Sequence, residues 1–187
     1  FYSPGFHYEA SMMIRAIIES ISRDGNIAIN ICLRPDGSIE EAAVTMLEEL
    51  GQWMNVNGEA VYGSHAWKVP AEGELVNGKL RKLPGGGLHK WHAEYPFSAQ
   101  DIRFTRGKSG HVYAFCMASP EGGQTIRIHS MGKQAGHMGP VEQVSLLGYD
   151  GQLQWVQTEE ALEIQCPDTL PFATSVVFRV SEAPVVE

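Results

Sequence analysis

The side chains that could do chemistry in this sequence of 187 residues stand in small, separate groups. His89 and His92 have a spacing that can bind a metal on a helix, but they lie in a Gly- and Pro-rich stretch without a third ligand nearby. The run Gly85–Gly87 lacks the lysine and the following Ser or Thr of a phosphate-binding loop. The three cysteines are odd in number and far apart, which argues against a disulfide framework and a zinc site. We therefore expect no metal site.

The carboxylates do not form an obvious catalytic pair either. Glu40, Glu41, Glu48 and Glu49 lie on one helical stretch, and an acidic run of this kind is usually a solvated face. Glu59 follows a helix stop, where a local hydrogen-bonding role is favoured over a catalytic one.

Aromatic side chains are concentrated at the start of the chain, between Phe1 and Tyr8. Rings of this kind either stack against the apolar face of a sugar or simply pack against one another and the protein core. Both interpretations are compatible with the sequence.

The elements that must position these residues begin with a helix, a strand and a second helix. Glu9–Ser22 carries apolar residues on one helical face, and Asn26–Leu33 is a near-continuous apolar run rich in β-branched Ile. Ser38 and Glu41 predict a capping box for a second helix that ends near Asn57. This order is that of an α/β protein with a parallel sheet, although one strand cannot form a sheet alone.

The second half of the chain changes to the period of two that is typical of strands. Glycine-bearing turns separate the segments, and their short, regular spacing predicts an antiparallel β-sandwich. The strands are expected at Asp101–Thr105, Val112–Ala118, Thr125–Met131, Val141–Leu147, Leu153–Gln157, Ala161–Cys166 and Ser175–Val180.

Composition excludes several classes of protein. The net charge of −8 without a basic stripe argues against a nucleic-acid partner. No apolar stretch approaches the roughly 20 residues that a membrane span requires. The chain begins at Phe1, without Met or a signal peptide, and enters a helix within ten residues, which suggests the middle of a protein.

Several motifs in a fixed order resemble the retaining α-L-fucosidases of glycoside hydrolase family 29, and the resemblance covers most of the chain. They are Ser22–Asn26 running into Asn30, Asp36–Ile39, Leu50–Trp53, Asn57–Gly63, Asp101–Thr105, Val112–Phe115 and Leu146–Gly148 with Leu153 and Trp155.

The resemblance implies a (β/α)8 catalytic barrel followed by a C-terminal antiparallel β-sandwich. Residues 1–66 would be the C-terminal end of the barrel, with 9–22 as its seventh helix, 26–33 as its eighth strand and 39–57 as its eighth helix. Residues 67–98 would be a linker with surface loops, and residues 99–187 the sandwich. Retention needs two carboxylates roughly 5–5.5 Å apart. The resemblance places both the nucleophilic Asp and the acid/base Glu upstream of Phe1, so we expect no catalytic residue in this chain.

The same resemblance suggests three substrate-binding residues. Phe1 and Tyr2 would be the remnant of a Trp-x-Tyr element before the seventh helix, and Asn30 matches an Asn at the end of the eighth strand. The chain departs from the family directly afterwards, because Cys32–Pro35 stands where the family has a small residue and then Gly-Pro. The loop that follows is therefore expected to differ in shape.

The leading hypothesis is the C-terminal part of an exo-acting enzyme that removes terminal α-linked fucose from glycans without a metal or organic cofactor. Its expected partners are a fucosylated oligosaccharide or glycoconjugate and the upstream part of the barrel. Relatives suggest a secreted or periplasmic protein. An uncovered strand at 26–33 would favour association with the missing part or with a second copy. The alternative is a non-catalytic sandwich module that binds carbohydrate or a polypeptide, motivated by Trp91, Tyr95, Tyr149 and Trp155.

Overall fold

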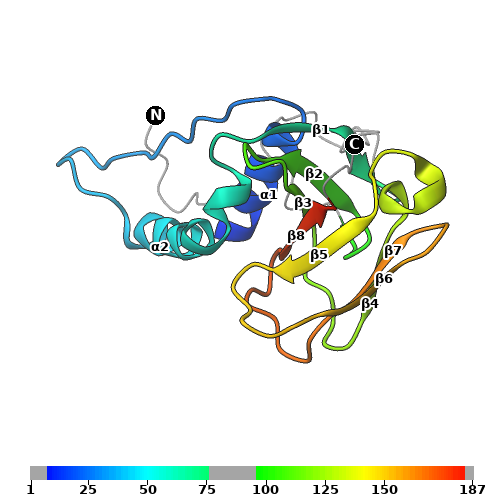
Figure 1. Ribbon diagram of the computed structural model, residues 1–187. Coiled ribbons are helices and arrows are strands. Elements are labelled where there is room, and N and C mark those ends of the chain that lie inside the picture. The colour runs from blue at the N-terminus through cyan, green and yellow to red at the C-terminus, as the bar shows by residue number, and fades with distance from the viewer. Residues whose placement is uncertain (1–7, 76–95, 184–187) are drawn as a thin grey trace.

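The computed structural model describes residues 8–75 and 96–183. Two helices lie on one side of a five-stranded sheet, and a three-stranded sheet lies on its other side (Figure 1). The helices are α1 (Ala10–Ile21) and α2 (Glu41–Asn57), and a short 3-10 turn, η1 (Gly58–Ala60), follows α2.

All strand pairings in the described residues are antiparallel. The five-stranded sheet has the order β1-β2-β3-β8-β5, and the three-stranded sheet has the order β4-β7-β6. The bounds are β1 His65–Glu72, β2 Ile102–Arg106, β3 Val112–Cys116, β4 Thr125–Ile128, β5 Val141–Leu146, β6 Gln154–Gln157, β7 Leu162–Gln165 and β8 Val177–Glu182, with 3-10 turns η3 His129–Met131 and η4 Lys133–Ala135. The seven strands expected from the sequence are all present, which confirms an all-β C-terminal domain.

The five-stranded sheet is buried on both faces because its side chains alternate between two cores. Phe104 and Phe178 point toward the three-stranded sheet and meet its Ile126. The neighbouring Phe115 and Val177 point the other way, into a second core that the helices complete.

The helices form where the apolar periodicity predicts them, and both bury one face against this sheet. Ile14, Ile17 and Ile18 of α1 and Trp53 of α2 belong to the second core. The expected capping box is wrong. Glu40 is the N-cap residue, without a side-chain cap, because the Ser38 hydroxyl donates instead to Asp36 Oδ1 at 2.7 Å.

The linker expected at 67–98 is wrong at its beginning, because β1 occupies His65–Glu72 and pairs with β2. Pro70 argues against a strand in the sequence, because proline has no backbone N–H to donate a hydrogen bond to a neighbouring strand. β1 tolerates it because it is an edge strand and its register shifts between Ala66 and Ala71.

The strand expected at 26–33 does not form either. Residues 25–32 belong to no helix or strand, and Leu33 makes only an isolated bridge to Ile39. A buried parallel strand exists only when neighbours on each side accept its backbone hydrogen bonds. The described residues offer no such neighbours, so the barrel part of the expected fold is not confirmed.

Candidate functional site

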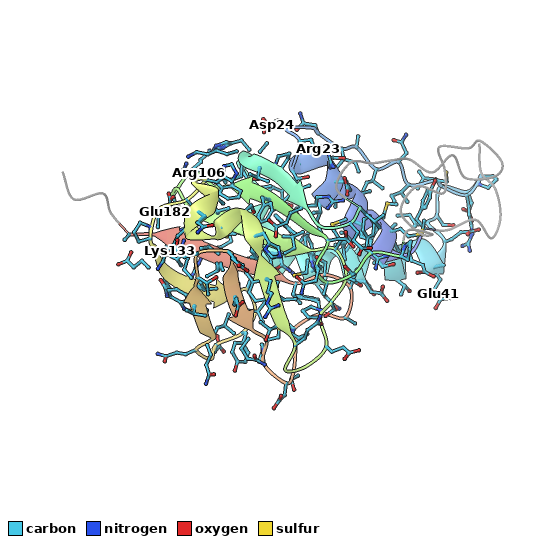
Figure 2. The ribbon with its side chains drawn as sticks, turned by 90° about the vertical axis from the view of Figure 1, so that its right-hand side faces the viewer. Arg23, Asp24, Glu41, Arg106, Lys133 and Glu182 are labelled. Atoms are coloured by element: carbon cyan, nitrogen blue, oxygen red, sulfur yellow. The ribbon has the colours of Figure 1, made fainter. Side chains whose placement is uncertain are left out.

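The segment between the two helices, residues 22–40, carries the expected site residue Asn30, and we call it the interhelix segment. It leaves α1 at Asp24, whose φ of 58° turns the chain sharply. It then runs away from the rest of the molecule before it returns to α2 (Figure 1). Arg23 and Asp24 lie at the end of α1, and Glu41 begins α2 (Figure 2). Asn30 is exposed in this segment.

A tight turn closes the far end of the interhelix segment. The Arg34 N–H donates to Ser38 O at 2.8 Å, and Gly37 adopts a φ of 84° that favours glycine. Ser38 donates its hydroxyl and its backbone N–H to the Asp36 carboxylate, and these hydrogen bonds lower the Asp36 pKa. Asp36 is thereby held in its charged form as a turn residue.

The interhelix segment carries exposed apolar side chains, although its Ile29 packs against the second core. Ile27, Leu33 and Ile39 are 40%, 52% and 39% exposed. Isolated exposed apolar residues are common, but several within one short segment mark a surface that contacts something else.

The structure describes only one residue of the expected aromatic loop. Phe1 and Tyr2, together with the rest of that loop up to residue 7, lie outside the described residues. Tyr8 is half-buried directly before α1. His89, His92 and Gly85–Gly87 also lie outside the described residues.

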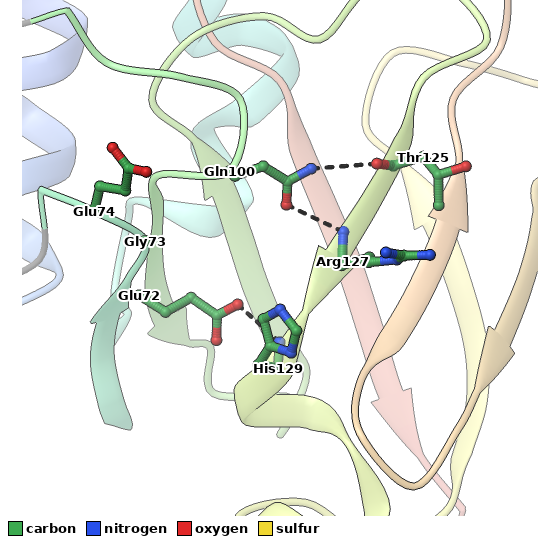
Figure 3. A pocket seen from close by; sticks show the side chains of 7 residues that line it. All are labelled: Glu72, Gly73, Glu74, Gln100, Thr125, Arg127 and His129. Carbon is green, nitrogen blue, oxygen red and sulfur yellow. Dashed lines mark hydrogen bonds between the residues drawn. The ribbon is translucent and has the colours of Figure 1, made fainter.

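A shallow pocket of about 560 Å³ lies where the end of β1 approaches β4 (Figure 3). Its lining residues are Glu72, Gly73, Glu74, Gln100, Thr125, Arg127 and His129. The Glu72 carboxylate accepts the backbone N–H groups of His129 and Ser130 at 2.9 and 2.8 Å. It therefore ties the first sheet to η3.

Gln100 makes a second bridge across this pocket. Its amide donates to Thr125 O at 3.2 Å and accepts the Arg127 N–H at 3.3 Å, which occupies the open edge of β4. The Arg127 side chain pairs instead with Glu163 at 3.1 Å. The hydrogen bonds of Glu72 and Gln100 connect the two sheets across this pocket. We therefore interpret the pocket as a structural contact and not as a catalytic site.

Other candidates from the sequence have structural roles. Glu59 pairs with Arg179 of β8 at 3.2 Å. Tyr149 and Trp155, which suggested a stacking platform, are half-buried against the sandwich core. Among residues 8–75 and 96–183, no three His, Cys, Asp or Glu side chains are arranged to hold a metal ion. None of the helices described there is long and apolar enough to cross a bilayer.

Polar residues on β2 and directly before it form a buried group that sequence reasoning missed. Asp101, Arg103 and Thr105 alternate with apolar residues and so resemble a solvated face, yet each is at most 2% exposed. The signal that could have found them is β3, whose residues Val112–Cys116 are apolar on both faces. A sheet with such a strand is covered on both sides, so polar residues on its neighbour are buried as well.

Comparison with known proteins places this arrangement in a family. Residues 2–59 match the family model described as "Alpha-L-fucosidase", and residues 96–181 match "Alpha-L-fucosidase C-terminal domain". The chain belongs to the α-L-fucosidase family. It matches the two family models one after the other along the chain.

Individual relatives agree with this assignment. The chain is 27% identical to human plasma alpha-L-fucosidase over 79% of its own length and 26% of that protein. It is 25% identical to human tissue alpha-L-fucosidase over 91% of its length and 30% of that protein. The chain therefore spans less than a third of the length of these curated relatives.

Solved structures of α-L-fucosidases share the fold. A Thermotoga maritima α-fucosidase in complex with a mechanism-based inhibitor superposes with a TM-score of 0.69 and 21% identity, over 96% of this chain and 36% of that one. An α-L-fucosidase from Bacteroides thetaiotaomicron, described as a trapped covalent intermediate, gives a TM-score of 0.60 and 19% identity, over 94% and 33%.

Proposed function

We propose that this chain is the C-terminal part of a retaining exo-α-L-fucosidase that removes terminal fucose from oligosaccharides or glycoconjugates. The observation that carries the proposal is the order of the two family matches, residues 2–59 followed by 96–181. The covalent intermediate named for the Bacteroides relative supports a double displacement. Such a mechanism needs a carboxylate nucleophile and a carboxylic acid/base, and we propose that both precede Phe1.

The role proposed for the chain is to close a (β/α)8 barrel and to supply the sandwich that supports it. The interhelix segment contains the proposed eighth barrel strand, residues 26–33. Ile27 and Leu33 are exposed there, and residues 25–32 belong to no helix or strand, as expected of a barrel strand whose sheet neighbours lie elsewhere in the barrel. Asn30 would then lie at the substrate end of the barrel, with Phe1 and Tyr2 on the adjacent loop.

This proposal includes no metal or organic cofactor, because hydrolysis by double displacement requires only the two carboxylates and water. It also includes a secreted or periplasmic location for the whole protein, and association of the isolated chain through its uncovered segment.

Two measurements test the proposed function. The longer protein that contains this chain should hydrolyse an aryl α-L-fucoside, whereas the isolated chain should not. Asn30→Ala in the longer protein should raise KM without changing Tm, and Asn55→Ala, an exposed residue of α2, should change neither. Turnover by the isolated chain that one of its own point mutations abolishes would show that the catalytic pair lies inside it.

Hydrogen exchange tests the proposed strand separately. Residues 26–33 should exchange rapidly in the isolated chain and become protected in the longer protein, while β6 stays equally protected in both. Rapid exchange of residues 26–33 in both proteins would refute their assignment to the barrel.

A further inference from the structure

A buried charge network links α1 to the sandwich, and Arg103 is its centre. Arg103 lies on β2 and its side chain is 1% exposed. Its Nε donates to Glu19 Oε1 of α1 at 2.7 Å, and its Nη2 forms an ion pair with the same oxygen at 2.5 Å. Nη2 also donates to Leu75 O at 3.0 Å. A charged side chain so deeply buried is retained only when its hydrogen bonds are well satisfied.

A second arginine, on α1 itself, extends this network. The Arg15 Nε donates to Met117 O, just past β3, at 3.0 Å. The guanidinium groups of Arg15 and Arg103 lie 5.8 and 5.7 Å from the ring centre of Phe97, close enough for cation–π contacts. Because Arg15 and Glu19 are four residues apart, they lie on the same face of α1 and hold it at two successive turns.

Asp101 holds the backbone that Arg103 contacts. Its Oδ1 accepts the Leu75 N–H at 2.8 Å, and its Oδ2 accepts the backbone N–H and the hydroxyl of Ser98 at 2.8 and 2.9 Å. Gly73 makes room for this carboxylate, since a Cβ there would lie 2.6 Å from Asp101 Oδ1. Asp101 therefore holds in place the residue that carries the Leu75 carbonyl acceptor.

Apolar packing alone would hold α1 on the sheet but would fix its position less sharply. Ile14, Ile17 and Ile18 supply that packing, and contacts between aliphatic side chains tolerate small shifts along a helix axis. The charged hydrogen bonds that a planar guanidinium donates are directional, so they tolerate such shifts less well. Burying the pair costs desolvation that an apolar pair avoids. Its advantage over an apolar pair therefore lies in positional precision.

We infer that Arg103 is a positioning residue that fixes α1 along its axis and, with it, the residues that lead into α1. This inference rests on the proposed function, in which the loop before α1 lies at the substrate end of the barrel. On that proposal, the sandwich sets the position of the helix that the loop precedes.

The decisive experiment compares four variants of the longer protein with an aryl α-L-fucoside. Arg103→Met and Glu19→Gln each break the pair, and the double variant Arg103→Met/Glu19→Met replaces it with apolar side chains. Arg127→Met is the matched control, because Arg127 also pairs with a glutamate but is 61% exposed.

Removal of the buried pair should lower kcat/KM by about 10- to 100-fold, since misplacement of a substrate-positioning group by about 1 Å costs up to that factor. The double variant should regain the wild-type Tm while kcat/KM stays low, and Arg127→Met should stay within about twofold of wild type. A double variant with wild-type Tm and wild-type kcat/KM would overturn the inference. The double variant keeps the test valid even if the single variants do not fold.

Hydrogen exchange separates failure of this inference from failure of the proposed function. If the wild-type longer protein does not hydrolyse fucosides, the proposed function fails, but the network can still be examined in the isolated chain. There the double variant should increase amide exchange in the first turns of α1 and leave exchange in β7 unchanged. Unchanged exchange in α1 would overturn the positional role of Arg103.

Discussion

Substitution of Trp53 tests whether the helices and the sandwich unfold as one unit. Trp53 lies on α2, is 1% exposed and packs near Phe115 of β3, with ring centres 6.4 Å apart. Its indole N–H donates to Ser175 O at 3.0 Å, next to β8. One side chain therefore contacts β3 and the residues that lead into β8.

The expected loss follows from this burial. Truncation of a buried aromatic residue to Ala costs about 3–5 kcal/mol, and the unpaired Ser175 carbonyl adds about 1 kcal/mol or more. Total stabilities of domains are about 5–15 kcal/mol, so Trp53→Ala brings the chain close to unfolding. Trp53→Phe keeps most of the packing and should cost about 1–3 kcal/mol.

Urea unfolding with two probes measures the effect. Helix ellipticity reports α1 and α2, and in Trp53→Phe the fluorescence of Trp67, buried in the sandwich core, contributes a report on the sheets. Both transitions should coincide and shift together relative to wild type. Tyr62→Ala is the control, because Tyr62 is 73% exposed, and it should change stability by less than about 0.5 kcal/mol.

A fluorescence transition that stays at the wild-type midpoint while the helix signal shifts would refute this reasoning. Such a result would mean that α2 unfolds independently of the five-stranded sheet.

Two further predictions concern glycine and cysteine. Gly122→Ala should destabilise the chain by about 1–3 kcal/mol, because the new Cβ would lie 2.4 Å from Asp168 O. Gly51→Ala, in an open part of α2, should stabilise the chain by about 0.4–1 kcal/mol. The two variants should therefore shift Tm in opposite directions, and shifts in the same direction would contradict this prediction. Burial raises the pKa of Cys166 to about 11, above the value of about 8.5 in an unfolded chain. Its contribution to stability is fully present below about pH 8.5 and is lost as pH rises through the folded pKa, at about 1.4 kcal/mol per pH unit. Cys166→Ala should flatten this alkaline decline in urea titrations, and an unchanged slope would show that the thiol does not contribute.

The local pattern of the sequence predicts most elements of the fold because each carries its own periodicity. Both helices and the seven expected strands lie within a few residues of their predicted bounds. β1 was missed because Pro70 and Gly73 are typical of loops, and only its position at the sheet edge, with a register shift beside Pro70, makes them acceptable. Whether a strand lies at the sheet edge depends on the order of the strands, and the periodicity of the sequence carries no information about that order.

The candidate site was less predictable because its residues depend on contacts distant in sequence. Asn30 and the residues 26–33 were chosen from a resemblance and from apolar composition, yet a strand needs partners that the described chain does not supply. Arg103 was missed because alternation with apolar neighbours cannot distinguish water from a helix on the second face. The apolar strand β3 indicates that this face is covered, but the partner of Arg103 is Glu19, which lies 84 residues away in the sequence.

The uncovered apolar surface of the chain is concentrated where the barrel would close, and this leads to a final prediction. Ile27 and Leu33 are 40% and 52% exposed in the interhelix segment, and Val156 on β6 of the sandwich is 52% exposed. Ile27→Ser/Leu33→Ser should leave the stability of the isolated chain within about 0.5 kcal/mol of wild type and reduce its self-association in light scattering. In the longer protein, a closed barrel would bury both side chains, so the same variant should lose about 1.5–3 kcal/mol for each of them. Val156→Ser should be neutral in both proteins. A double variant that is neutral in the longer protein would show that the segment stays exposed, and the barrel assignment of residues 26–33 would then be wrong.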